Sequence, residues 1–320
     1  MTAAPASAEP TSLSTGPAVP IIRNKRPRSL FPWALLVPTL VILGILVGYP
    51  LVRLFVMSFQ EYGAKQLFGQ PARFIGLDNY TSILSDGDFW SVLTRSVALM
   101  VVCVVLTLGV GTLVALLMMR LNKGFRLLVS VGMLLAWAMP PLSATIVWGW
   151  IFDNQFGIVN YLLGKVTGND WTGHSWLANP VGFFTVAAII IVWGAIPFVA
   201  FTMYAGLTQV PTEVLEAAQL DGAGPVARFR LIMVPFVRPI FTVLVILSVI
   251  WDLRVFTQIY ALQGMGGLIS ETNVLGTYIY QQAFSSSNYG VASAIGVIMV
   301  IILMSISSFY VRRTIKEEEL

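Results

Sequence analysis

The 320-residue chain has very little charge, because only 11% of its residues are Asp, Glu, Lys or Arg while 57% are hydrophobic. A soluble domain carries roughly 25% charged residues. A water-soluble fold of this length is therefore excluded, since it could not hide so much apolar surface. The composition predicts an all-α membrane protein in which lipid takes the place of water.

Cysteine and histidine are almost absent, with Cys103 and His174 the only residues of their types. A single cysteine excludes a disulfide framework and a cysteine-rich metal site, and a single histidine excludes the usual multi-histidine ligand sets. His174 is interpreted as an exposed loop residue rather than a proton relay. No metal site is expected.

Sequence motifs for nucleotide binding, catalysis and cofactor binding are also missing. No phosphate-binding G-x-x-x-x-G-K-[ST] loop occurs, so this chain cannot itself be an ATP-binding subunit. No H-E-x-x-H motif, nucleophile–base set or cofactor-binding motif occurs either. The sequence therefore gives no support to a function as a membrane enzyme. The net charge of +4 is modest, and basic residues in a membrane protein mark topology rather than a nucleic-acid footprint. We expect no catalytic residues, no cofactor and no nucleic-acid partner.

Long apolar runs are what the sequence does contain. A helix needs roughly 20 apolar residues to cross the hydrocarbon. Six transmembrane helices are predicted, at residues 33–52, 96–119, 127–152, 181–207, 237–251 and 291–311. The third contains Pro140 and Pro141, and Gly194 with Pro197 is expected to interrupt the fourth.

The distribution of basic residues predicts the orientation. If the N-terminus is inside, 13 of the 19 Lys and Arg residues fall in inner segments and 6 in outer ones. The positive-inside rule then places both termini in the cytoplasm. Residues 1–30 are rich in Ala, Pro, Ser and Thr and end in a basic cluster, which predicts a disordered cytoplasmic tail. Residues 31–313 form the transmembrane domain, and residues 314–320 a short cytoplasmic tail.

One inner loop, at about residues 209–238, is long and contains several glycines and prolines that are expected to start or end helices. Thr212 is expected to cap a short helix, Gly222 to end it in a left-handed turn, and Pro225 to start a second helix. Pro235 and Pro239 are expected to separate that second helix from the fifth span. A helix lying on lipid would have a basic polar face, whereas this first helix is acidic, which favours a protein partner.

The loop carries a spaced motif: Glu216-Ala217-Ala218, three residues, Gly222, nine residues, Ile232, one residue, then Val234-Pro235. This pattern resembles the EAA loop of ABC-importer permeases, with Val234 in place of the usual Leu. The Asp221-Gly222-Ala223 stretch resembles the form common in carbohydrate importers. The resemblance covers roughly residues 30–313.

This resemblance implies a type I importer permease of the maltose-type class in a bacterial cytoplasmic membrane. Its partners would be a second homologous permease, favouring a heterodimer, a cytoplasmic ATPase dimer that binds ATP-Mg, and an extracellular solute-binding protein. The residues implied to couple to the ATPase are Glu216, Ala217, Ala218, Asp221 and Gly222. The chain would form half of a sugar pathway across the bilayer.

A substrate pathway is predicted near the fourth and fifth spans. The stretch Trp193-Gly194-Ala195-Ile196-Pro197-Phe198 resembles one in maltose-type permeases, with the glycine displaced by one position. The family's substrate sites also imply Ser248, Trp251 and Asp252. An aromatic ring beside a carboxylate suits a sugar, and an acid near membrane depth is costly without a role. The alternative for Asp252 is an ion pair with Arg254.

The substrate and the energy source stay open. The scarcity of Lys and Arg in the spans favours a neutral di- or oligosaccharide, with an N-acetylated amino sugar or a polyol phosphate as alternatives. A stand-alone secondary transporter is the alternative mechanism, although Asp252 is its only candidate coupling acid. In the outer loop, Trp171 and Trp176 are interpreted as an interfacial aromatic belt or as a contact with an external partner.

Overall fold

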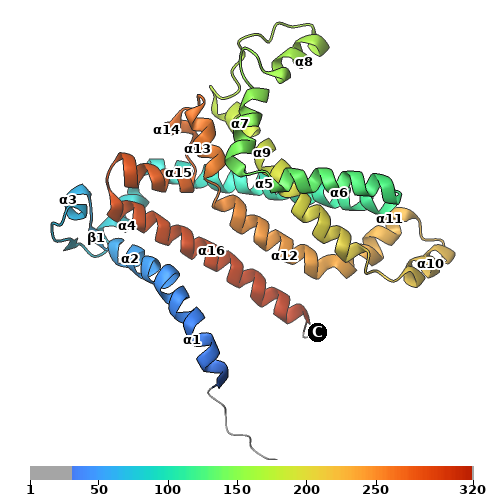
Figure 1. The fold of residues 1–320 in the computed structure, drawn as a ribbon, viewed down its shortest axis with the longest axis horizontal. Helices are drawn as coiled ribbons and strands as arrows, with labels where there is room; N and C mark the ends of the chain where they lie inside the picture. The colour runs from blue at the N-terminus through green and yellow to red at the C-terminus, as the bar shows by residue number, and fades with distance from the viewer. Residues whose placement is uncertain (1–30, 319–320) are drawn as a thin grey trace, which may run out of the picture. The chain divides into compact units, whose positions relative to one another are not determined.

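The computed structural model describes residues 31–318, and most of them lie in helices (Figure 1). The chain divides into two compact units, Met1–Pro50 and Leu51–Leu320, each of which is described by itself. The predicted disordered tail at residues 1–30 lies outside the described residues. The predicted C-terminal tail at 314–320 is described only to residue 318, where the last helix ends.

The first unit consists of α1 (Phe31–Leu43) and a π-helical turn, η1 (Gly44–Gly48), which leads into α2 (Tyr49–Met57). Large apolar side chains such as Leu35 and Leu46 are exposed on it. Proline lacks an N–H group and its ring crowds the carbonyl one turn back. The wide turn directly before Pro50 leaves room for that ring, so the helical backbone continues without a break.

The second unit begins within α2 and continues into a small antiparallel ribbon, in which Gln60 pairs with Phe74 and Glu61 with Arg73. The Glu61 and Arg73 side chains also form an ion pair at 3.6 Å. The elements up to the middle of the chain are β1 (Gln60–Glu61), α3 (Ala64–Leu67), β2 (Arg73–Phe74), α4 (Asp78–Ser85), α5 (Gly87–Arg120), α6 (Lys123–Ala138), α7 (Pro141–Ile151) and α8 (Ile158–Thr167).

The remaining elements form the other half of the bundle and its connecting loops. They are α9 (Pro180–Leu207), α10 (Thr212–Leu220), α11 (Pro225–Arg228), the π-helical turn η2 (Phe229–Met233), α12 (Val234–Leu253), α13 (Thr257–Gly264), α14 (Ile269–Thr272), α15 (Leu275–Tyr280), the π-helical turn η3 (Gln281–Ser285) and α16 (Tyr289–Glu318).

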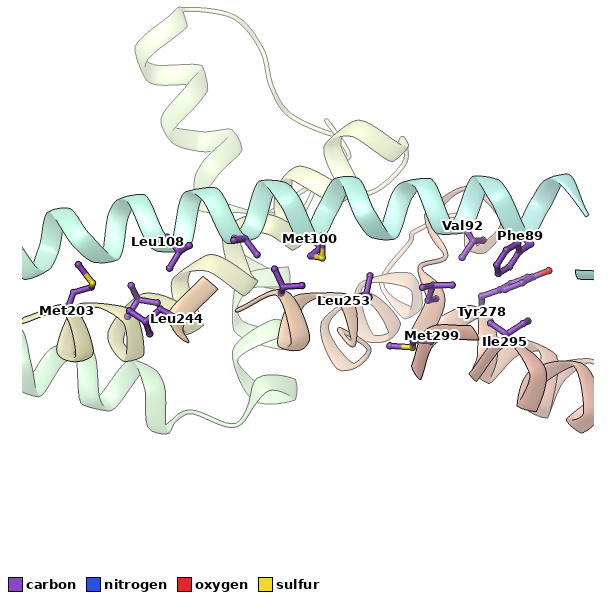
Figure 2. Close-up of a cluster of buried hydrophobic side chains, with 14 of the residues drawn as sticks. Phe89, Val92, Met100, Leu108, Met203, Leu244, Leu253, Tyr278, Ile295 and Met299 are labelled. Atoms are coloured by element: carbon purple, nitrogen blue, oxygen red, sulfur yellow. The ribbon is translucent and has the colours of Figure 1, made fainter. Parts of the chain in front are cut away.

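Helix α5 is the centre of this unit, and it packs against both α9 and α12. A row of buried side chains follows it, from Phe89 near its start to Leu108 beyond its middle (Figure 2). Gly111 permits the close approach to α9, because a Cβ there would lie 2.6 Å from Val199 Cγ1. Within a bilayer, where lipid tails are as apolar as these side chains, close van der Waals packing along this row holds the helices together.

Polar groups anchor the loop helices at the N-terminal end of α5. Ser96 Oγ accepts a hydrogen bond of 2.8 Å from the Leu275 backbone N–H, which ties the start of α15 to α5. Gln263 Nε2 donates to Thr272 Oγ1 at 3.2 Å and to Asn273 Oδ1 at 3.1 Å, and Asn273 Nδ2 donates to Gln281. These bonds satisfy buried polar side chains and hold α13, α14 and α15 together.

Five helical stretches are long and apolar enough to cross a membrane: Leu35–Met57, Gly87–Arg120, Pro180–Leu207, Pro225–Gly264 and Tyr289–Arg312. The predicted third span at 127–152 is instead a pair of helices, α6 and α7, bent by 103°. It is the sixth crossing if the pair counts as one span. The expected break at Pro140 and Pro141 is therefore confirmed.

Three local predictions are wrong. Gly194 and Pro197 do not interrupt the fourth span, because α9 runs unbroken through them while packed against α5, α6 and α12. Pro235 and Pro239 do not separate the loop from the fifth span, since the η2 turn precedes Pro235 and the helix continues. Thr212 does not cap α10; it is the first residue of that helix, and Pro211 precedes it without a side-chain bond.

Candidate functional site: a polar cavity and a helical elbow

The elbow, defined as residues 212–228, is a bent pair of short helices, α10 and α11. Gly222 has φ = +86°, so the expected left-handed turn is confirmed. The Ala223 N–H donates to the Ala218 carbonyl at 2.9 Å, and the Gly222 N–H donates to the Gln219 carbonyl at 3.1 Å. These two bonds are the Schellman pattern that closes a helix C-terminus.

The side chains of the elbow are arranged with the acids outward. Glu216, Ala217, Asp221 and Gly222 are exposed, and Ala218 is half-buried. Among the side chains that the structure describes, neither Glu216 nor Asp221 forms an ion pair with a basic group. Four of the five predicted coupling residues are thus exposed, and the two acids among them have no basic partner in the described part of the chain.

A side-chain hydrogen bond at the surface also holds the bend. Arg228 Nη1 of α11 donates to Gln219 Oε1 of α10 at 2.8 Å. Because this bond joins the two helices across the turn, the angle of the elbow depends on side chains as well as on Gly222. Figure 1 shows α10 and α11 near the C-terminal end of α5.

The pathway cavity, of about 390 Å³, lies between α6–α7, α9 and the end of α12. Trp193, Gly194, Trp251 and Asp252 line it, so the structure brings together four of the six residues predicted for a substrate pathway. No heavy atom lies within 4 Å of a Cβ built at Gly194. The glycine therefore leaves free space rather than a tight helix contact.

Two aromatic pairs frame the cavity. Phe198 does not line it but packs edge-on against Trp251, with ring centroids 5.0 Å apart. Trp193 packs in the same way against Trp148 at 5.8 Å. Edge-to-face pairs of this kind contribute about 0.5–1.5 kcal/mol beyond area burial, so both tryptophans are fixed in orientation while part of each ring stays open.

Asp252 is 7% exposed, and its Oδ2 atom has no hydrogen-bond partner in the described structure. The alternative of an ion pair with Arg254 is not found among the described residues, although Arg254 also lines the cavity. Ser248, one turn before Asp252 on α12, is buried and does not line the cavity. A buried carboxylate oxygen without a hydrogen-bond partner costs free energy.

Sequence reasoning missed several residues that complete the cavity. Trp137 lies in the last turn of α6 and Met139 directly follows that helix. Phe256 and Gln258 come from the segment after α12. The signal for the first pair was the break at Pro140, because a bend of 103° exposes the residues directly before it. Phe256 and Gln258 lie beyond the predicted span at 237–251, and no sequence pattern marks them as cavity residues.

A larger hollow on the second unit does not suit a polar solute. It measures about 750 Å³ and is lined almost wholly by apolar side chains of α5 and α9, with Arg95 among its few polar residues. Recognition of a polar solute needs several hydrogen-bonding groups. The pathway cavity has them, whereas this hollow offers aromatic rings but few polar groups.

The loop around α8 carries the tryptophans of residues 170–176. Trp171 and Trp176 are stacked with centroids 6.1 Å apart, and the exposed His174 ring packs edge-on against both. Asn160 of α8 holds them, since Trp176 Nε1 donates to its Oδ1 at 2.7 Å. The Thr172 N–H donates to Asp170 at 2.8 Å and keeps the pKa of that carboxyl below its usual value.

Comparison with known proteins agrees with this architecture. Residues 107–316 match the family described as binding-protein-dependent transport system inner membrane component. The chain is 38% identical to the diacetylchitobiose uptake system permease protein DasB of Streptomyces coelicolor, over 92% of this chain and 89% of that protein. It is 29% identical to the trehalose/maltose transport system permease protein MalF of Thermococcus litoralis, over 88% and 92%.

A solved bacterial ABC transporter that imports the polysaccharide alginate has a chain of the same fold, with a TM-score of 0.77 at 22% identity, over 90% of this chain and 96% of that one. The fold is therefore that of an ABC-importer permease. The chain belongs to the family of inner membrane components of binding-protein-dependent transport systems. It is a multi-pass membrane transport subunit, as the sequence predicted.

Proposed function

We propose that this chain forms half of the pathway of an ATP-driven sugar importer and that its elbow couples the pathway to a cytoplasmic ATPase. The elbow supports this, because a rigid bend that presents unpaired acids suits a protein partner better than lipid. On this proposal both termini and the elbow lie in the cytoplasm. The ATPase dimer binds ATP-Mg and carries out hydrolysis, and this chain contributes no catalytic residue.

The substrate we propose is a neutral di- or oligosaccharide. The pathway cavity offers three tryptophan side chains, Trp137, Trp193 and Trp251, for the apolar faces of sugar rings. Asp252 and Arg254 are its two charged residues and their formal charges cancel, which favours a neutral solute over a polyol phosphate. Similarity to a diacetylchitobiose permease makes an N-acetylated disaccharide the first candidate.

The observation that carries the substrate proposal is the unpartnered Asp252 beside the exposed face of Trp251. It is tested by thermal-shift screening of the cognate solute-binding protein against neutral, N-acetylated and phosphorylated sugars. Stabilisation by a neutral saccharide is expected. Selective stabilisation by a sugar phosphate would contradict the proposal.

Assembly with a second, homologous permease and an external solute-binding protein completes the proposed importer. A solved alginate importer has been crystallised with its oligosaccharide-bound periplasmic protein. Co-expression with candidate partner permeases and analysis of the purified complex distinguish a heterodimer, which is expected, from a homodimer. A complex that contains two copies of this chain and no second permease would overturn the heterodimer.

A further inference from the structure

A second cavity, of about 440 Å³, lies where the C-terminal end of α5 meets the elbow. Leu116, Met119 and Arg120 of α5 form one side, and Arg228, Phe229 and Met233 form another. Leu215 of α10 also lines it. The cavity therefore joins a membrane-spanning helix directly to the element proposed to contact the ATPase.

The charge of this cavity is not balanced. Its two charged residues, Arg120 and Arg228, are both basic, and no Asp or Glu lines it. Arg228 Nε is buried without a hydrogen-bond partner in the described structure, although Nη1 is bound to Gln219. A buried donor without an acceptor is costly, and two guanidinium groups that line one cavity favour an anion that accepts hydrogen bonds from them.

The apolar side chains that line this cavity indicate which kind of anion it would bind. Leu116, Met119, Phe229 and Met233 give an apolar lining that a free inorganic ion would not use. Leu116 and Met119 lie in the last two turns of a span whose hydropathy suits a bilayer, and Arg120 ends that helix. Basic pockets between transmembrane helices at the membrane boundary suit the headgroups of anionic lipids.

We propose that this cavity binds an anionic phospholipid, with its phosphate between Arg120 and Arg228 and an acyl chain along the apolar wall. Since Arg228 also holds Gln219 across the bend, a bound phosphate would fix the side chain that sets the angle of the elbow. The effect on coupling rests on the proposed function. The lipid site itself does not.

The test is native mass spectrometry of the full chain purified in mild detergent and titrated with phosphatidylglycerol or phosphatidylcholine. The wild type should retain phosphatidylglycerol selectively, and Arg120→Gln should weaken that retention by about fivefold. Arg120→Lys should restore it in part. Arg230→Gln is the matched control, because Arg230 is exposed on the adjacent π-helical turn and does not line the cavity.

Three results would overturn the proposal. The first is equal retention of phosphatidylglycerol by the Arg120→Gln and Arg230→Gln variants. The second is displacement of the lipid by inorganic phosphate at an equal concentration, which would make the cavity a site for free anions. The third is loss of the lipid when the ATPase is added, which would show that a partner carboxylate occupies the cavity. None of these readouts requires transport, so failure here leaves the proposed function untouched.

Discussion

The elbow and the pathway cavity are built in opposite ways. The elbow is a continuous stretch of chain, and its predicted residues are mostly exposed. Its geometry is set by one left-handed glycine, two backbone hydrogen bonds and the bond between Arg228 and Gln219. The cavity collects residues from α6, α7, α9 and the end of α12, and its key carboxylate is buried. Single substitutions should therefore alter the elbow mainly by changing its backbone conformation, and the cavity mainly by removing side-chain groups that would contact the solute.

The largest effect is expected from Gly222→Val. A Cβ at Gly222 meets open space, so the penalty comes from φ = +86° alone. A β-branched residue strained in this region costs about 1–3 kcal/mol, or roughly 5- to 150-fold in the population of the bent loop. Uptake by the assembled importer in vesicles should fall in proportion, while membrane insertion is retained.

Two variants sharpen this result. Gly222→Asn should retain most uptake, because Asn tolerates the left-handed region. Gly224→Val is the matched control, since Gly224 lies two residues away with φ = −67° and also faces open space. Equal loss in Gly222→Val and Gly224→Val would show that bulk, rather than backbone shape, is what matters.

The next largest effect is expected from Trp251→Ala in the cavity. Loss of one sugar-stacking ring should lower uptake by about tenfold, since a stacked or edge-packed aromatic contact of this kind is worth about 0.5–1.5 kcal/mol beyond its buried area. Co-purification with the ATPase and basal ATP hydrolysis should not change. Trp150→Ala is the control, because Trp150 is 71% exposed on α7 and does not line the cavity. Loss of co-purification would indicate a folding role instead.

Asp252→Asn should separate function from stability. Removing a buried carboxylate that lacks a partner should raise the thermal unfolding temperature, because the desolvation cost of the charge, about 1–3 kcal/mol or more, is relieved. Uptake should fall because the amide is a weaker acceptor for sugar hydroxyls. Lower stability together with normal uptake would contradict both the free carboxylate and its role.

The smallest effect is expected at Asp170, outside both regions. The Thr172 N–H lowers the pKa of Asp170 below its ordinary 3.8, so this interaction stabilises the folded loop above that pH and is lost as pH falls through the lowered value. The ¹⁹F NMR signal of fluorotryptophan at Trp171 should be constant at neutral and mildly acidic pH and shift only in strong acid. Asp170→Ala should remove the shift. A shift near neutral pH would rule out Asp170 as its origin.

The two regions also differ in how far they could be predicted. Gly222, Pro225 and the acids of α10 were readable because helix ends and turns depend on neighbouring residues. The predictions from Pro197 and Pro235 were wrong, since α9 continues unbroken within its packing and the η2 turn makes room for a proline ring. Trp193, Trp251 and Asp252 were named by resemblance, but Trp137 and Gln258 depend on a bend and a loop that only the assembled bundle reveals.

The most direct test of the proposed coupling is the energy source for uptake by the reconstituted importer. Proteoliposomes that contain this chain, its partner permease and the ATPase are supplied with the binding protein and labelled saccharide. Uptake should require hydrolysable ATP on the ATPase side and persist after proton and sodium gradients are collapsed. Uptake that follows an ion gradient in the absence of ATP would contradict the account and favour a secondary transporter with Asp252 as its coupling acid.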